Sequence, residues 1–188
     1  MKLLSQRPVL IGLILAILMA ATRMHHFGSA LHLPDASLAV FLLAGFFIAG
    51  PLLLVGLLLE AAALDYVAIA HLGVSDYCVT PAYWFLIPTY AVLWLAGRYY
   101  ARIHQYSLRS LGIFAGLAVA ALSAAFLVSN GAFYLFSERY PAMGMAEYAA
   151  RVAQYYSQYL AGGLLYLVCA AALYAVLTAR APAAAKAE

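Results

Sequence analysis

A lone cysteine, Cys78, has the clearest potential for chemistry in this sequence. It follows Asp76 and Tyr77 directly and lies seven residues after His71. The thiolate form of cysteine is both a nucleophile and a soft metal ligand. A lone exposed thiol outside the cytoplasm is a liability unless it is used, so we interpret Cys78 as a functional residue, and an incidental buried cysteine is the alternative.

Two carboxylates, Glu60 and Asp65, lie within an otherwise apolar segment. A charged side chain at membrane depth costs about 2.5–3.5 kcal/mol on insertion scales, so such residues usually face the interior of a helix bundle and have a partner there. Asp65 lies roughly 9 Å from the end of its segment, at 1.5 Å per residue. It is expected either to bind a ligand or anchor a loop, or to be a buried structural group. The role of Glu60 stays open.

Other polar and sulfur-containing residues have weaker signals. Adjacent histidines, His25 and His26, point in different directions from a helix and have no carboxylate at ligand spacing, which makes them a poor metal site. Cys169 is too deep in its apolar segment for a disulfide with Cys78 and is expected to have a packing role. Several tyrosines near one boundary form an interfacial aromatic belt or line a pocket: Tyr77, Tyr83, Tyr134, Tyr140, Tyr148, Tyr155, Tyr156 and Tyr159.

The composition predicts that membrane-spanning helices position these residues. Hydrophobic residues make up 68% of the 188 positions and charged residues only 9%, whereas soluble domains carry about a quarter charged residues. One crossing of the hydrocarbon layer needs about 20 apolar residues. We therefore expect an all-α integral membrane protein, a single-domain bundle of six transmembrane helices. Its approximate spans are 8–22, 36–49, 51–71, 82–97, 111–129 and 155–178.

Local residues set the breaks between these spans. Gly50 and Pro51 end the second span, because proline lacks a backbone N–H and its ring clashes with the preceding turn. Pro51 can then begin the third span. Gly73, Ser75 and Asp76 indicate a loop around Cys78. The stretch 130–154 is expected to be a long connection. Basic residues and an apolar run at the amino terminus resemble a signal peptide, but no small-residue cleavage site follows, so this segment is expected to stay as the first helix.

The distribution of basic residues predicts the orientation. With both termini in the cytoplasm, seven Lys and Arg residues fall on the inner side and three on the outer side, in agreement with the positive-inside rule. The outer side then receives the Cys78 loop. The inner group is Lys2, Arg7, Arg98, Arg102, Arg109, Arg180 and Lys186, and the outer group is Arg23, Arg139 and Arg151.

Several functional classes are not indicated by the sequence. No GxxxxGK[ST] stretch is present, so an ATPase would have to be a separate subunit. No CxxC pair indicates a thioredoxin-like redox site, and the scattered basic residues argue against a nucleic-acid groove. Gly12, Ala16 and Ala20 place small residues on one face of the first helix, where they could dock a partner subunit or pack within the chain.

The stretch DYVAIAHLGVSDYCVTPAY, from Asp65 to Tyr83, resembles the BtuM family of solitary substrate-binding components (S-components) of energy-coupling-factor transporters. The resemblance is an aspartate near a helix end, a lone cysteine thirteen residues later and a tyrosine five residues beyond. The six helices, the cytoplasmic termini and the small residues of the first helix agree with the same plan.

This resemblance implies uptake of cobalamin or a related corrinoid, such as cobinamide, across a bacterial inner membrane. It implies that Cys78 is an axial ligand to the cobalt of the substrate and that Asp65 and Tyr83 shape the pocket, with His71 and Tyr77 as further candidate binding residues. Cys78 could also displace the upper cyanide ligand of cyanocobalamin. The family class implies docking through Gly12, Ala16 and Ala20 to an energising membrane subunit with two ATPases, or transport without one.

Two other classes stay open. A membrane cysteine peptidase or transpeptidase of exosortase type would need a cysteine, a histidine and an arginine at one surface, and among the histidines His71 is on the side of Cys78 whereas His104 is on the opposite side. A structural membrane subunit would need no chemistry at Cys78.

Overall fold

The computed structural model describes residues 2–23, 33–48 and 50–184, and all regular structure within them is helical. This confirms the predicted all-α class. The elements in chain order are α1 (Lys2–Arg23), α2 (Ser37–Phe47), α3 (Pro51–His71), the 3-10 helix η1 (Pro81–Phe85), α4 (Leu86–Ile103), α5 (Leu108–Phe136) and α6 (Met145–Ala184).

Three of these helices are long and apolar enough to cross a membrane, namely α3, α5 and the Met145–Thr178 part of α6. The apolar part of α1, Pro8–Arg23, and all of α2 are shorter. Large apolar side chains also face outward, with Leu52 85% exposed, Leu59 67% and Val168 64%. Surfaces of this kind are unfavourable in water and suit contact with lipid, so the helices have the character of a membrane protein.

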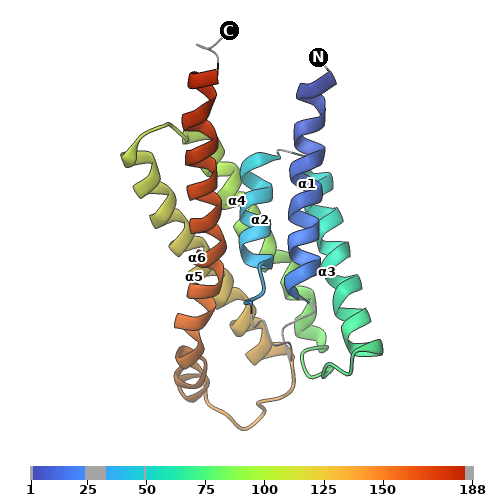
Figure 1. Cartoon of the computed structure of the whole chain (residues 1–188). Coiled ribbons are helices and arrows are strands. Elements are labelled where there is room, and N and C mark those ends of the chain that lie inside the picture. Colours follow the sequence, from blue (N-terminus) through green and yellow to red (C-terminus); the bar gives the residue numbers. More distant parts are fainter. Residues whose placement is uncertain (1, 24–32, 49, 185–188) are drawn as a thin grey trace.

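The helices run in alternating directions along one axis. Figure 1 shows that α1 begins and α6 ends at the same end of the bundle, which also holds the α2–α3 and α4–α5 connections. The α3–α4 and α5–α6 connections lie at the opposite end. We call the first the terminal end and the second the Cys78 end.

The helix boundaries agree with the predicted spans where glycine or proline marks them. Helix α3 covers the predicted 51–71, and Gly73, with φ of +70°, follows its last turn in the left-handed conformation that suits glycine. Helix α2 is slightly shorter than the predicted 36–49. Helix α1 begins earlier than residue 8, and the segment predicted to span 82–97 is η1 followed by α4, which continues to Ile103.

The predicted long connection over 130–154 is wrong. Helix α5 starts at Leu108 and continues to Phe136, beyond the predicted 111–129, and α6 begins at Met145 instead of 155. Polar residues and tyrosines suggested a loop, but the alanines after Met145 favour a helix, and Glu147 in the first turn interacts favourably with the helix dipole. The connection is therefore only 137–144.

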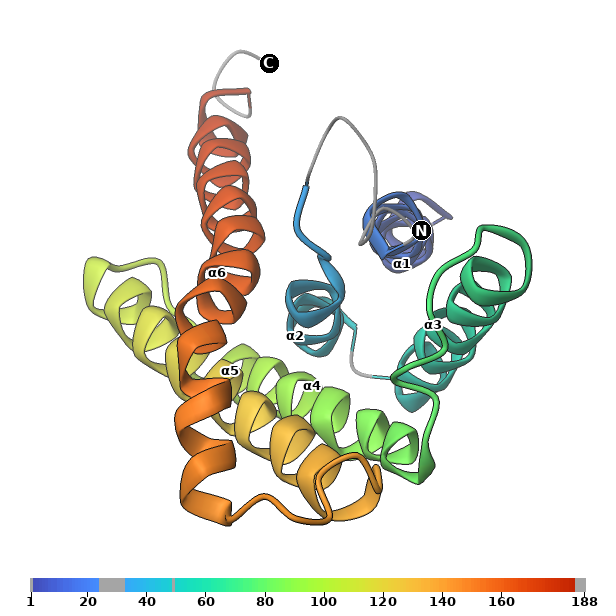
Figure 2. The ribbon, with the colours of Figure 1, turned by 90° about the horizontal axis from the view of Figure 1, so that it is seen from below.

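The core is centred on α2, which is buried along most of its length. Seen along the bundle, α2 lies inside the ring formed by the other helices (Figure 2). Phe41 of α2 stacks on Tyr90 of α4, with ring centroids 4.1 Å apart. Leu93, Leu122 and Leu167 add fully buried side chains from α4, α5 and α6.

Helices α2 and α4 approach most closely at two glycines. A Cβ atom added to Gly45 would collide with the carbonyl oxygen of Trp94, and one added to Gly97 would collide with that of Leu42. Small residues allow such backbone contact between membrane helices. This crossing fixes α2 against α4 toward the terminal end.

Candidate functional site

An ion pair between Arg23 and Asp65 organises the Cys78 end of the bundle. Arg23 is the last residue of α1, and Asp65 lies in α3. Its Nε donates to Asp65 Oδ1 and its Nη2 to Asp65 Oδ2, each at 2.7 Å. The Arg23 side chain is only 9% exposed. This is the bidentate geometry in which an arginine–carboxylate pair is strongest.

The same guanidinium also contacts α2 and α4. Its Nη1 donates to the hydroxyl of Tyr90 at 2.8 Å and to Ser37 Oγ at 2.9 Å, and Asp35 lies 3.4 Å away. Tyr90 is itself held by its stacking on Phe41. Arg23 thus joins four helices through one side chain.

The residues before α2 are fixed by the same cluster. Asp35 Oδ1 accepts hydrogen bonds from the backbone N–H of Ser37 at 2.8 Å and from its hydroxyl at 2.6 Å. Thr22 Oγ1 accepts from the backbone N–H of Ala36 at 3.1 Å and donates to the carbonyl of Leu18 at 2.9 Å. These bonds satisfy N–H groups that the start of a helix otherwise leaves without partners.

Tyr83 also joins the cluster. Its hydroxyl donates to Asp65 Oδ2 at 2.7 Å, so the structure brings together two of the candidate residues, which are 18 positions apart. Asp65 therefore anchors η1 and α1 to α3, one of the two roles left open for it. Sequence reasoning missed Arg23 as its partner, although an acid at membrane depth calls for one and Arg23 lies at the same predicted boundary.

Cys78 lies in the loop between α3 and η1, next to this cluster. It is a free and exposed cysteine. The loop is closed by hydrogen bonds from the backbone N–H of Val79 to the carbonyl of Asp76 at 2.8 Å and from that of Thr80 to the carbonyl of Cys78 at 3.0 Å. The thiol is accessible at the Cys78 end of the bundle, opposite the chain termini.

The surroundings of Cys78 keep its thiol protonated. Although the residue is exposed, partial shielding by protein atoms raises the pKa of the thiol above its ordinary value, and the negative charge of Asp65 raises it further, while Arg139 opposes both effects. Reactive catalytic cysteines show the opposite shift. The described surroundings of Cys78 therefore do not activate its thiol as a nucleophile.

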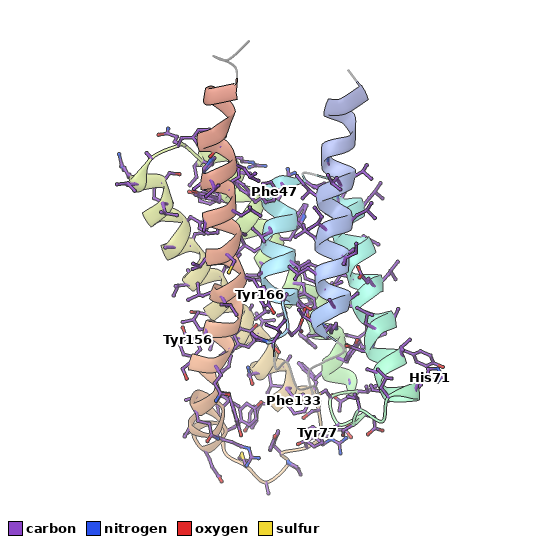
Figure 3. All side chains as sticks on the ribbon, in the orientation of Figure 1. Phe47, His71, Tyr77, Phe133, Tyr156 and Tyr166 are labelled. Atoms are coloured by element: carbon purple, nitrogen blue, oxygen red, sulfur yellow. The ribbon has the colours of Figure 1, made fainter. Side chains whose placement is uncertain are left out.

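Tyr77 fastens the loop to the connection between α5 and α6. The guanidinium of Arg139 lies over the Tyr77 ring, 4.7 Å from its centroid. The Tyr77 and Tyr140 hydroxyls are 3.4 Å apart, and the Phe133 ring lies 5.8 Å from that of Tyr77. Figure 3 shows Tyr77 and Phe133 in this region. Tyr77 thus contacts protein side chains on one side of the loop.

His71 does not join the other candidates. It is exposed at the end of α3, and Figure 3 shows it at the outer edge of the bundle. Within the described residues no hydrogen bond or ion pair ties it to Cys78, and the described residues hold no group of three His, Cys, Asp or Glu that could bind a metal ion. His25 and His26 lie outside the described residues.

The small-residue face of α1 packs at least partly within the chain. Gly12 is buried, and a Cβ added to it would lie 3.6 Å from side-chain atoms of Ile48 and Leu53. Ala16 packs against the core, and Ala20 is half-buried. Internal packing is thus the observed role of Gly12, and docking of a partner through this face stays a prediction.

The structure also shows where Cys169 and Glu60 lie. Cys169 is exposed on α6, so the packing role expected for it is not seen within the described chain. Glu60 is half-buried in α3, and no hydrogen-bonding partner is present for it within the part of the chain that the structure describes.

Two cavities of the bundle lie away from Cys78. One of about 780 Å³ is lined by residues of the terminal end, including Tyr100, His104 and Tyr174. Another of about 370 Å³ lies between α5 and α6. Neither is lined by Cys78, Asp65 or Tyr83.

Comparison with known protein families and with curated protein sequences finds no match for this chain.

Proposed function

We propose that this chain is a membrane component for corrinoid uptake, similar to the BtuM family, and that Cys78 binds the cobalt of cobalamin as an axial ligand. The observation that carries the proposal is an accessible free thiol, Cys78, in a loop next to a rigid cluster formed by Arg23, Asp65 and Tyr83. A soft thiolate suits a transition metal, and a rigid support holds the ligand in place.

The proposal includes six membrane crossings with both termini in the cytoplasm of a bacterial cell. Arg98 and Arg102 belong to the last part of α4 and Arg109 to the first turn of α5. The α4–α5 connection is at the same end of the bundle as the start of α1 and the end of α6 (Figure 1), as the positive-inside rule favours for a cytoplasmic end. Helix α2 has 11 residues, too few to cross alone at about 20 residues per crossing. Irregular backbone at membrane depth is tolerated where other parts of the protein bury it. The burial of α2 by its neighbouring helices therefore accommodates the irregular backbone at its two ends.

The Arg23 cluster supports binding because it fixes the helix ends next to the Cys78 loop. An arginine whose charge is already paired by protein groups loses no further solvation energy when a large ligand covers it. An unpaired arginine would lose solvation energy, and this loss would oppose binding. Tyr83 and Tyr77 then offer ring surfaces beside the thiol, and His71 is a candidate at the outer edge. The corrin ring is expected to lie against the Cys78 end.

The chemistry at cobalt is a ligand exchange without change of oxidation state. The sulfur of Cys78 forms a bond to Co(III) as the bond from cobalt to the upper cyanide, or to the nucleotide base of the ligand, breaks. When cyanide leaves, the proton released from the thiol leaves with it as hydrogen cyanide, and when the nucleotide base leaves, that proton passes to solvent. The raised pKa of Cys78 makes this release of a proton part of binding.

The proposal also includes a choice of energy source. Either an energising membrane subunit with two ATPases docks on the chain, or the chain transports without one. Because Gly12 packs inward, a partner on α1 would meet Ala20 together with the exposed side chains of Leu13 and Ile17.

The test uses the second cysteine as a matched control. Protein purified from cells supplied with cobalamin is expected to be red and to show a shifted visible spectrum that reports sulfur on cobalt. Cys78→Ala should lose the shifted spectrum and most of the affinity, and Cys169→Ala should keep both. A colourless intact protein, or a Cys78→Ala variant with unchanged affinity and spectrum, would show the proposal to be wrong.

A further inference from the structure

We propose that Arg139 binds the phosphate of the nucleotide that distinguishes cobalamin from cobinamide, and so sets which corrinoid this chain prefers. The inference rests on the proposed function, because it concerns a second contact with the same substrate. In cobalamin the nucleotide is tethered to the edge of the corrin ring and carries one negative charge on its phosphodiester, whereas cobinamide lacks the nucleotide. A cation beside the cobalt ligand would therefore stabilise only one of the two corrinoids.

Arg139 lies next to the backbone of Cys78. Its Nη2 is 3.5 Å from the carbonyl oxygen of Tyr77, and that carbonyl belongs to the peptide bond that precedes Cys78. The positive charge of Arg139 also acts on the thiol, because it lowers the pKa of Cys78 against the larger effects that raise it. A group bound to this guanidinium would thus lie beside a ligand held on the sulfur.

The guanidinium of Arg139 is held in place while its donors stay accessible. It lies over the ring of Tyr77, 4.7 Å from the ring centroid, and the residue is exposed. The backbone N–H of Arg139 donates to Ser137 Oγ at 3.3 Å, and Ser137 is buried. An arginine over an aromatic ring can still direct its five N–H donors to an anion. Its position is therefore set before any ligand binds.

No carboxylate neutralises this arginine. Unlike Arg23, it forms no ion pair with an Asp or Glu of the described residues, and residues 24–32 contain neither acid. Arg151 adds a second cation to the same cluster, since its guanidinium lies 5.8 Å from the ring centroid of Tyr140. The hydroxyl of Tyr140 is in turn 3.4 Å from that of Tyr77. Two touching tyrosines thus carry two arginines.

The acids at the Cys78 end do not oppose such a contact directly. Asp76, Glu138 and Glu147 are exposed, and none of them forms an ion pair with either arginine. Charges in water are screened over about 10 Å at 0.1 M salt, whereas a hydrogen bond between a guanidinium and a phosphate is strengthened by both charges. Direct contact with Arg139 therefore outweighs the more distant acids.

A phosphate is the anion that this arrangement suits. A guanidinium binds two phosphate oxygens through parallel N–H donors. When Cys78 replaces the nucleotide base on cobalt, the base is released and the phosphate that tethers it can approach groups beside the thiol. The phosphate of a lipid headgroup offers the same chemistry, and the experiment separates these two sources.

The experiment compares two corrinoids on the purified full-length chain in a detergent without phosphate groups. Isothermal titration calorimetry gives the dissociation constants of cyanocobalamin and dicyanocobinamide, and the visible spectrum reports sulfur on cobalt. Arg139→Gln removes the charge and keeps a polar side chain. Arg109→Gln is the matched control, because Arg109 is exposed in the first turn of α5, at the terminal end (Figure 1). Phosphate in lipid extracts of each protein is measured in parallel.

We expect Arg139→Gln to weaken binding of cobalamin about tenfold, which corresponds to the loss of one charge-assisted hydrogen bond. Its affinity for cobinamide, its sulfur–cobalt spectrum and its content of lipid phosphate should equal those of the native protein. Arg109→Gln should bind both corrinoids as the native protein does.

Three results would overturn this inference and leave the proposed function intact. Equal loss of affinity for both corrinoids would show that Arg139 only holds Tyr77 in place. Unchanged affinity for both would show that it binds no part of the substrate. Less lipid phosphate in Arg139→Gln, with an unchanged preference between the corrinoids, would assign the arginine to the membrane. Failure of the native protein to bind either corrinoid would instead refute the proposed function, and this inference with it.

Discussion

The two ends of this bundle handle polar side chains in opposite ways. At the Cys78 end, one arginine with little exposure is neutralised by two aspartates and surrounded by hydroxyl groups. At the terminal end, His104 and its tyrosines form a ring cluster beside a cavity, and the described residues that line this cavity include no Asp, Glu, Lys or Arg. Charge pairing thus draws the helices together at one end, whereas an aromatic cluster bridges helices that lie farther apart at the other.

The largest effect is expected from removing the charge partner at the Cys78 end. Arg23→Leu leaves Asp65 partly buried without its bidentate partner, and loss of one member of a buried pair costs about 3–5 kcal/mol. The free energy of unfolding, measured by titration with a denaturing detergent, should fall by that amount.

Arg139→Leu is the matched control at the same end, because Arg139 is exposed and its removal should change stability by less than about 1 kcal/mol. The double variant Arg23→Leu with Asp65→Leu should be more stable than Arg23→Leu alone. Equal stability of the two arginine variants would contradict the role given to the cluster.

The next largest effect is expected at the contact between α2 and α4. Gly97→Ala and Gly45→Ala each introduce a methyl group that collides with a carbonyl oxygen of the facing helix, and overpacking of this kind costs about 1–3 kcal/mol. Thermal unfolding in detergent measures the loss. Gly56→Ala, where the added methyl meets nothing within 4 Å, should be neutral or slightly stabilising, and a loss as large as that of Gly97→Ala would refute the explanation.

Binding of cobalamin should depend on pH in a direction set by Cys78. Because the pKa of its thiol is raised, the protonated form prevails at neutral pH, and the metal must displace that proton. When the leaving group is the nucleotide base and the thiol proton passes to solvent, the affinity should fall about tenfold, or about 1.4 kcal/mol, for each pH unit below the pKa of the thiol. When cyanide leaves as hydrogen cyanide, it carries the proton away and this dependence on pH cancels. Titrations followed by the visible spectrum at several pH values test this, and the slope should vanish in Cys78→Ser.

The smallest effect is expected within the aromatic cluster. Tyr174→Phe removes the hydroxyl that contacts His104 and Tyr106 but keeps the ring, so stability should fall by about 0.5–1.5 kcal/mol. Detergent unfolding is again the measurement. Tyr99→Phe serves as the comparison, because Tyr99 is exposed and takes part in no hydrogen bond of the described residues. A loss above 3 kcal/mol would show that the terminal end depends on polar pairing as strongly as the Cys78 end.

The sequence predicts well those helix boundaries that are determined by residues adjacent in the chain. The boundaries of α3 follow from the backbone properties of three residues, Gly50, Pro51 and Gly73. The family resemblance implied that Asp65 and Tyr83 shape one pocket, but the hydrogen bond between them was not predicted. The start of α6 at Met145 was missed because tyrosines and charged residues at a membrane boundary suit a loop and a helix equally well.

Contacts that depend on packing between distant helices could not be predicted in this way. Arg23 is separated from Asp65 by 42 positions, and nothing local indicates which acid it meets. Gly45 and Gly97 gain their importance only when α2 and α4 cross. Phe46, Tyr100 and Tyr174 come from three helices, and only the folded bundle makes them neighbours.

The short and enclosed α2 has a consequence for how the protein is made. This helix packs chiefly against α4, which the ribosome delivers about forty residues later, while the amino-terminal part of a chain emerges first. During that interval α2 has neither the length to hold a place in the bilayer by itself nor the surface that will eventually cover it. Full burial of α2 therefore requires synthesis to pass Ile103, the last residue of α4.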